Sequence, residues 1–159
     1  MVHGVVQGVM VDVWWGIVER QQGEYDFEAY ERLFHKLADA GLKVQAIMSF
    51  HAAGTNVGDT CTITLPEWVL KLGEDNPDIF YTDQHGHRNR ECLSTGCLHE
   101  RVLEGRTCIE VYTDFIRRFC AKFDHLLGVF RLQSAVLLSV VIVSIFMPIQ
   151  SRIDLDTRL

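Results

Sequence analysis

GVMVDVWW, at residues 8–15, decides the fold of this chain together with KVQAIMSF, at residues 43–50. Both are short runs rich in aliphatic and aromatic residues. Such runs are typical of parallel strands buried on both faces, because strands with one solvated face alternate instead. Between the two runs, Asp26 predicts the N-cap of a helix that extends to about Ala40, with Gly41 at its C-terminal cap. The predicted order is therefore strand, helix, strand.

The predicted helix carries apolar residues at helical spacing, namely Tyr30, Leu33, Phe34 and Leu37. A helix between two buried strands requires a parallel pair with a right-handed crossover. In parallel α/β folds, ligands bind at the carboxyl ends of the strands. Asp12 lies near the end of the first predicted strand and His51 lies just beyond the second. We therefore expect these two polar side chains to converge on one rim.

Composition excludes several classes of protein. The chain has 159 residues, of which 48% are hydrophobic and 23% charged, as in an ordinary globular protein of about one domain. A net charge of -6 with no basic stripe argues against a nucleic-acid partner. The five cysteines lack the dense spacing of a disulfide scaffold, which indicates reduced thiols. The first residues do not resemble a signal peptide, so a cytoplasmic or plastid location is expected rather than secretion.

The second half contains two further predicted helices. Pro66 opens a short helix in WVLKLGEDNPD, and Pro77 breaks it. Residues 81–107 are polar, carry glycine and show no period, so they predict an elaborate loop over the rim. A longer helix is expected from about Ile109 to Leu127. Its apolar residues recur at four-residue spacing, at Val111, Phe115, Phe119 and Phe123.

An apolar tail follows Gly128. Residues 135–147 form a run of thirteen residues without a charge, ended by Pro148. A membrane-spanning helix needs about 20 apolar residues, so a span is not expected. Attachment to a membrane through residues 132–149 stays open as an alternative.

Polar groups near the strand ends suggest a ligand site. Asp12 stands in an apolar strand, so it either meets a basic partner or faces a solvated cleft, and both interpretations stay open. Trp14 and Trp15 are by composition core residues rather than a ligand platform. A histidine that faces a cleft (His51), two carboxylates (Asp12 and Asp59) and nearby aromatic faces would together suit a polyhydroxylated ligand.

Other polar residues are weaker candidates for a metal site or for catalysis. A histidine and cysteine cluster lies at His85, His87, Cys92, Cys97 and His99. Its spacing matches no common zinc site, so no metal is expected. Of three further carboxylates, Glu67 and Glu110 read as solvated residues, whereas the role of Glu19 stays open.

The order of motifs resembles a known family. Along the chain stand GVMVDVWWGIVE, GLKVQAIMSFH, NVGD, LPEWVL, NPDIFYTD, RNRECLS, GRT and VYTDF. This succession resembles the plant-type beta-amylases of glycoside hydrolase family 14 over roughly residues 8–128. That family folds as a (β/α)8 barrel, which implies an α/β fold here, a partial TIM barrel of roughly the second to fourth βα units. The domain prediction is a barrel fragment at 8–128 and a divergent apolar tail at 129–159, which replaces the family's next strand and whose origin stays open.

The resemblance assigns roles to individual residues. The family's loop signature is His-x-Cys-Gly-Gly-Asn-Val-Gly-Asp, and residues 51–59 read HAAGTNVGD, with Ala53 and Thr55 departing from it. By resemblance, Asp12, His51 and Asp59 bind glucose hydroxyls at the non-reducing end of the substrate. The lid loop of the family corresponds to the segment containing Gly54, Asn56 and Gly58.

The family's reaction is inverting hydrolysis of α-1,4-glucans, which releases maltose in starch degradation without a cofactor. Inversion needs one carboxylic acid and one carboxylate base. The family's acid lies in a Gly-Glu-Leu-Arg-Tyr-Pro motif and its base much further along, and neither motif occurs in these 159 residues. The resemblance therefore implies a truncated product that binds α-1,4-glucan or maltose, has no catalytic residues of its own and is inactive alone. No partner protein is expected. The alternative is a non-catalytic glucan-binding or regulatory fragment.

Overall fold

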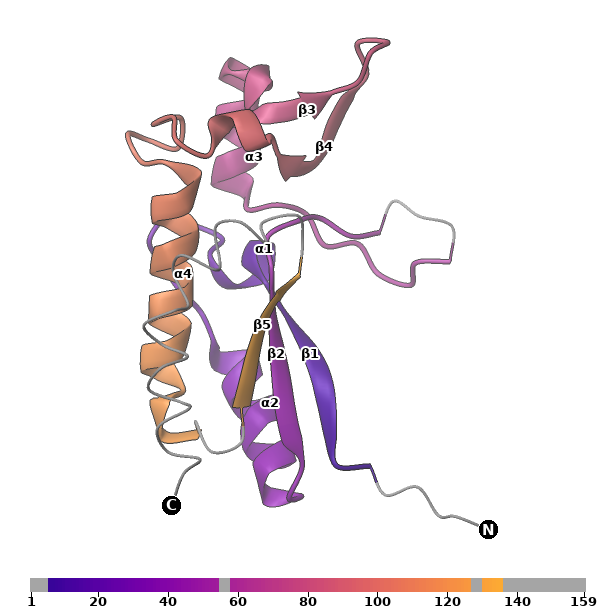
Figure 1. The fold of residues 1–159 in the computed structure, drawn as a ribbon, viewed down its shortest axis with the longest axis vertical. Coiled ribbons are helices and arrows are strands. Elements are labelled where there is room, and N and C mark those ends of the chain that lie inside the picture. Colours follow the sequence, from indigo (N-terminus) through magenta and orange to yellow (C-terminus); the bar gives the residue numbers. More distant parts are fainter. Residues whose placement is uncertain (1–5, 55–57, 127–129, 136–159) are drawn as a thin grey trace.

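The structure is a computed structural model that describes residues 6–54, 58–126 and 130–135. Strands β1 (Gly8–Trp14) and β2 (Lys43–Ser49) are parallel, and α2 (Glu28–Asp39) connects them. Strand β5 (Phe130–Ala135) pairs in parallel with the other side of β2, so the sheet order is β1-β2-β5 (Figure 1). The predicted parallel pair with a helical crossover is confirmed.

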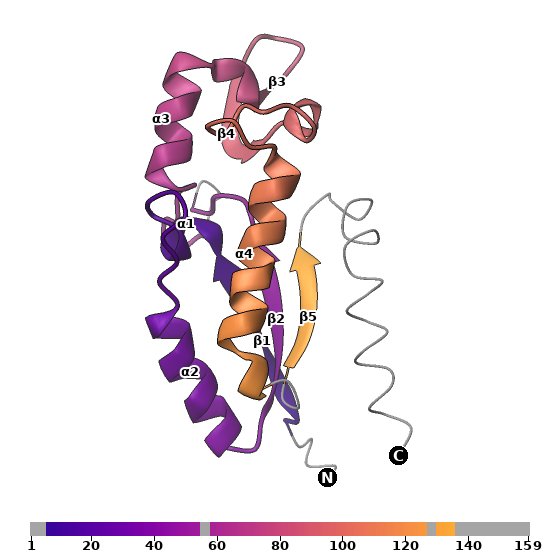
Figure 2. The ribbon, with the colours of Figure 1, turned by 90° about the vertical axis from the view of Figure 1, so that its left-hand side faces the viewer.

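The two long helices cover one face of this sheet. Helices α2 and α4 (Cys108–Lys122) lie on the same side of the strands (Figure 2). Val13, Ala46 and Met48 are each 0% exposed and belong to the core cluster that includes the helix residues. Because successive residues of a strand point to opposite faces, Met10 at 68% exposure lies on the other face with Asp12.

Helix α2 begins slightly later than predicted. Phe27 is its N-cap, whereas Asp26 stands one residue earlier and accepts a hydrogen bond at Oδ1 from the backbone N–H of Glu28 at 2.9 Å. The predicted C-terminal end holds, because the helix ends at Asp39 and Gly41 adopts φ 71°, the left-handed geometry of a glycine after a helix.

Three of the four apolar residues predicted for the buried face of α2 contact the core. Tyr30 is 7% exposed, Phe34 is 0% exposed and Leu37 is partly buried. The prediction for Leu33 is wrong, because its side chain remains 39% exposed. Leu33 stands beside Phe34 in the sequence and is therefore turned about 100° away from it around the helix.

The aromatic run at the end of β1 does not continue as a strand. β1 stops at Trp14, and Trp15 begins the one-turn helix α1 (Trp15–Val18), which the sequence did not predict. This turn places the Trp15 side chain in the core at 0% exposure, as predicted for that residue, while Trp14 is only partly buried.

The predicted loop at 81–107 is wrong in its first part, because a β-hairpin forms there. Strands β3 (Phe80–Thr82) and β4 (Arg88–Leu93) are antiparallel. The Asp83 side chain organises the turn by accepting hydrogen bonds at Oδ1 from the backbone N–H groups of His85 and His87, at 2.8 and 2.9 Å. The hairpin is preceded by α3 (Glu67–Asp75) and η1 (Pro77–Ile79) and followed by η2 (Thr95–Cys97).

Helix α4 is shorter than predicted but buries the expected face. It starts with a capping box in which the Thr107 hydroxyl accepts from the Glu110 N–H at 3.1 Å and the Glu110 carboxylate accepts from the Thr107 N–H at 2.9 Å. It ends before Phe123, and η3 (Asp124–Leu126) follows. The apolar residues predicted for its buried face all lie in the core, namely Val111, Phe115, Phe119 and Phe123.

The region predicted to be a divergent tail begins as part of the sheet. Residues 130–135 form β5 where the tail was expected to replace a strand, whereas residues 136–159 lie outside the described residues. The described strands form an open three-stranded sheet and the separate two-stranded hairpin, with no closed barrel, so the fold is a mixed α/β arrangement. Within the described part of the chain, no helix has both the length and the apolar character to cross a membrane.

Candidate functional site

The carboxyl ends of β1 and β2 place Asp12 beside a serine. Asp12 pairs with Ile47 in the parallel register, and Ser49 stands two residues further along β2 on the same face. The Ser49 hydroxyl donates to Asp12 Oδ1 over 2.6 Å. The polar partner of Asp12 is thus a neutral hydroxyl, and no ion pair involves Asp12 among the described residues.

His51 meets the end of β1 through an aromatic contact. The rings of Trp14 and His51 pack edge to face, with centroids 5.1 Å apart and an angle of 61° between the planes. The backbone N–H of Trp14 donates to the Tyr30 hydroxyl at 3.0 Å, which connects the strand end to α2. The structure therefore brings Asp12 and His51 to one rim, as the topology predicts.

One ring nitrogen of His51 is buried without a hydrogen-bond partner. Within the described residues, His51 Nδ1 is shielded from solvent and receives or donates no hydrogen bond. Leaving a buried polar atom unsatisfied costs about 1–3 kcal/mol, so native structures rarely retain such an atom without a reason.

Asp59 closes the base of the loop that follows His51. Its Oδ2 accepts a hydrogen bond from the backbone N–H of Gly54 at 3.0 Å. Gly54 has φ 103°, and a Cβ atom there would lie 2.5 Å from the carbonyl oxygen of Cys61, so only glycine fits. Gly58 also has a positive φ, of 99°, and Asn56 lies outside the described residues. The lid function of this loop stays a prediction.

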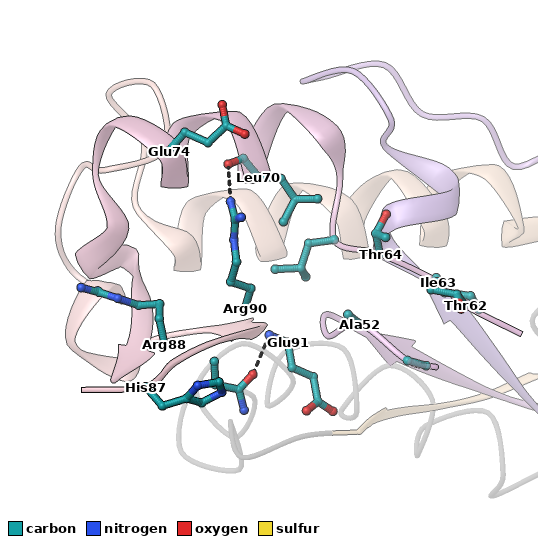
Figure 3. A pocket seen from close by; sticks show the side chains of 13 residues that line it. Ala52, Thr62, Ile63, Thr64, Leu70, Glu74, His87, Arg88, Arg90 and Glu91 are labelled. Atoms are coloured by element: carbon teal, nitrogen blue, oxygen red, sulfur yellow. Dashed lines mark hydrogen bonds between the residues drawn. The ribbon is translucent and has the colours of Figure 1, made fainter. Parts of the chain in front are cut away.

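A cavity of about 560 Å³ adjoins this loop, and the sequence did not predict it (Figure 3). One wall is the antiparallel bridge between Ala53 and Ile63, and α3 and β4 form the others. The Arg90 guanidinium crosses it and donates to the Leu70 carbonyl at 3.2 Å. The lining residues are Ala52, Ala53, Thr62, Ile63, Thr64, Leu65, Leu70, Glu74, His87, Arg88, Asn89, Arg90 and Glu91.

Glu19, whose role the sequence leaves open, is a buried hydrogen-bond acceptor. It is 0% exposed, and its two carboxylate oxygens accept from Trp15 Nε1 at 2.7 Å and from the Gly23 N–H at 2.9 Å. Burial raises the pKa of Glu19 above 4.5, and the hydrogen bonds from Gly23 and Trp15 oppose that shift. Glu19 therefore holds together the segment that follows β1 in the chain, from Trp15 to Gly23.

The other carboxylates and the histidine and cysteine cluster lie elsewhere. Glu67 is exposed, and Glu110 serves the capping box and an ion pair with Arg101 at 3.1 Å. His85 and His87 lie on the turn of the β3–β4 hairpin. Over the described ranges, no group of three or more His, Cys, Asp or Glu side chains could hold a metal ion.

Sequence reasoning missed Ser49. It stands in the apolar run of β2 and is 0% exposed, so nothing in the local sequence distinguishes it from a small core residue. The signal that could have found it is the register of a parallel pair, because a polar residue in β2 on the same face as Asp12 is placed to meet that carboxylate.

Comparison with known proteins identifies the relatives of this chain. The family model described as "Glycosyl hydrolase family 14" matches residues 2–136, which extends past the predicted domain boundary at residue 128. "Beta-amylase 2, chloroplastic" of Arabidopsis thaliana is 52% identical over 121 residues, which cover 76% of this chain and 22% of that protein. "Beta-amylase" of Trifolium repens is 54% identical over 124 residues, covering 77% of this chain and 25% of that protein.

A solved structure agrees with these relatives. The catalytic domain of beta-amylase from Paenibacillus polymyxa is similar with a TM-score of 0.64 and 29% identity, covering 79% of this chain and 29% of that one. The chain spans 22% to 25% of the length of the curated relatives it matches. The family model, the curated relatives and the solved structure agree on one assignment: this chain belongs to glycosyl hydrolase family 14 and corresponds to part of a beta-amylase.

Proposed function

We propose that this chain carries the part of a beta-amylase that holds the non-reducing end of an α-1,4-glucan, with Asp12, His51 and Asp59 as hydrogen-bonding groups for glucose hydroxyls. The observation that carries the proposal is the convergence of Asp12 and His51 on one rim, at the carboxyl ends of β1 and β2. A sugar hydroxyl can both donate to a carboxylate and accept from or donate to an imidazole, so one glucose unit suits this pair.

The proposed role of the chain is binding, and cleavage belongs to the longer enzyme of the family. Inverting hydrolysis of starch to maltose needs two carboxyl groups roughly 6.5–9.5 Å apart that face the scissile bond. Glu19 is the buried carboxyl nearest in sequence to the rim, but both of its oxygens are occupied by Trp15 and Gly23. A carboxyl that is 0% exposed and bonded in this way is unsuited to protonate a substrate.

Calorimetry with maltose tests the proposal. The full chain should bind maltose with a measurable heat, and Asp12→Ala and His51→Ala should each abolish it. Asp75→Ala is the matched control, because Asp75 is an exposed carboxylate at the end of α3. A chain that gives no heat of binding even at high millimolar maltose would contradict the proposal.

A reducing-sugar assay separates binding from cleavage. We expect the chain to release no maltose from soluble starch under conditions in which it binds maltose. Release of maltose that is lost in Asp12→Ala would instead assign hydrolysis to this chain and overturn the binding-only part of the proposal.

A cytoplasmic or plastid location completes the proposal. Its support is that three relatives carry the description chloroplastic: two from Arabidopsis thaliana, at 52% and 50% identity, and one from Oryza sativa subsp. japonica, at 52% identity. Cell fractionation with an antibody against the chain should find it in the soluble cytoplasmic or plastid fraction. Recovery from the secreted fraction would contradict this location.

A further inference from the structure

Ser49 lies where it can control the orientation of Asp12. It is 0% exposed, so a ligand at the rim does not reach it. Its hydroxyl oxygen lies 2.6 Å from Asp12 Oδ1 and 3.5 Å from the carbonyl oxygen of Ile47. A hydroxyl has one proton, and the much shorter contact shows that Asp12 receives it. The length is that of a charge-assisted hydrogen bond from a hydroxyl to a carboxylate.

We propose that Ser49 is a positioning residue that fixes the Asp12 carboxylate for ligand binding. The last torsion of an aspartate side chain is soft, so the plane of its carboxylate is set by its hydrogen bonds. The Ser49 hydroxyl holds Oδ1, and within the described part of the chain no hydrogen bond reaches Oδ2. Oδ2 is thus the oxygen presented to a sugar hydroxyl. This inference rests on the proposed function, in which Asp12 binds glucose.

The sheet explains why the anchor comes from β2. Ser49 pairs with Trp14 of β1 on one side and Ala135 of β5 on the other, so the backbone of its strand is held from both sides. Asp12 belongs to β1, which has one paired neighbour in the described sheet. The hydrogen bond from Ser49 therefore fixes the Asp12 side chain, which belongs to an edge strand, to a strand whose backbone is paired on both sides.

Tyr30 offers a matched control for Ser49. It is a second buried hydroxyl near the end of β1, at 7% exposure, and it accepts from the backbone N–H of Trp14 at 3.0 Å. Tyr30→Phe removes one buried hydrogen bond at this strand end, as Ser49→Ala does. Only Ser49→Ala removes a hydrogen bond to the Asp12 carboxylate, so a loss of stability common to both variants is separated from a loss of orientation.

Maltose calorimetry on the full chain tests the proposal. Ser49→Ala should bind maltose about tenfold more weakly, the size expected for losing a hydrogen bond to a charged group. Ser49→Thr, which keeps the hydroxyl, should restore most of the affinity, and Tyr30→Phe should bind as the wild type does. Maltose binding that is abolished by Asp12→Ala yet unchanged in Ser49→Ala would overturn the proposal.

A second measurement keeps the proposal testable without a ligand. In chain labelled with ¹³C at the aspartate carboxyls, the Asp12 resonance is assigned by its loss in Asp12→Asn. It should move in Ser49→Ala and stay in place in Tyr30→Phe. If the wild type binds no maltose, the proposed function fails by itself, and this resonance still decides the role of Ser49: an unchanged position in folded Ser49→Ala rules it out, and a shifted one supports it.

Discussion

Gly73 of α3 packs against the ring of Phe80 so closely that a Cβ atom at residue 73 would lie 2.0 Å from Cε2 of that ring. The contact lets the hairpin strand β3 lie directly on the helix, and both residues are buried. In most helices, replacing glycine with alanine stabilises the helix by about 1 kcal/mol. At residue 73 we expect the same replacement to destabilise the protein.

We predict that Gly73→Ala lowers the free energy of unfolding by about 1–3 kcal/mol, because the added methyl group overpacks a filled site. Urea denaturation followed by circular dichroism measures this. Gly96→Ala is the control, since a Cβ atom there meets only Ser94 Oγ, at an ordinary 3.5 Å. Equal stability of Gly73→Ala and the wild type would show that Phe80 moves aside at no cost.

The cluster of rings between α2 and α4 should dominate stability. Phe34 is 0% exposed, and its ring contacts those of Phe119 and Phe123 at centroid distances of 6.1 and 5.1 Å. Phe34→Ala should cost about 3–5 kcal/mol because it leaves a cavity. Leu33→Ala, at the 39% exposed neighbour on the same helix, should cost less than about 1 kcal/mol. Similar losses in the two variants, measured by urea denaturation, would argue against this packing.

The capping box of α4 makes a smaller prediction. Thr107→Ala removes the side-chain acceptor for the Glu110 N–H and should lower the free energy of unfolding by about 1 kcal/mol. Thr107→Ser keeps the hydroxyl and should remain within a few tenths of the wild-type value. Thermal unfolding of the three proteins side by side tests it, and an alanine variant as stable as the serine variant would mean that the cap contributes nothing.

The pKa of Glu19 predicts how stability depends on pH. Burial raises that pKa above 4.5, so the folded chain holds the proton more tightly than the unfolded chain. The free energy of unfolding should therefore fall as pH rises from 4.5 through the folded-state pKa, and Glu19→Gln should remove this fall. Urea denaturation of both proteins across that range measures the difference, and a difference that does not change with pH would refute the prediction.

Glu31 provides a comparison of opposite sign. Its hydrogen bond and ion pair with Lys122, at 2.8 Å, lower the pKa of Glu31 below 4.5. The stability it contributes is present above that value and is lost as pH falls through the folded-state pKa. In Glu31→Gln, the loss of stability on the acid side should therefore be smaller than in the wild type. The same loss of stability in both proteins below pH 4.5 would contradict the assigned ion pair.

Much of the fold could be predicted because its core follows simple periods. The four-residue spacing from Val111 to Phe123 predicts the buried face of α4, and the apolar run 43–50 predicts β2. The β3–β4 hairpin could not be predicted in this way, because β3 has only three residues and β4, RNRECL, is largely exposed or partly exposed. Its turn depends on two hydrogen bonds that the Asp83 carboxylate accepts from backbone N–H groups, and not on a hydrophobic period.

The candidate site, too, has a part that the sequence predicts and a part that it does not. Topology alone predicts that Asp12 and His51 share a rim, because the carboxyl ends of parallel strands meet at one edge. The bond between Ser49 and Asp12 joins residues 37 positions apart and depends on the exact register of two strands, which no local pattern encodes. The unpartnered Nδ1 of His51 likewise follows from three-dimensional packing.

The register that pairs Asp12 with Ile47 also limits where the chain can accept insertions and deletions. A one-residue insertion or deletion inside the seven residues of β2 would turn every following side chain to the opposite face of the sheet. Ser49 would then point toward the helices, and a core residue such as Met48 would take its place beside Asp12. An insertion at the exposed turn around Gly41 leaves the register intact. Length variation among descendants of this chain should therefore be found in that turn and be absent from β2.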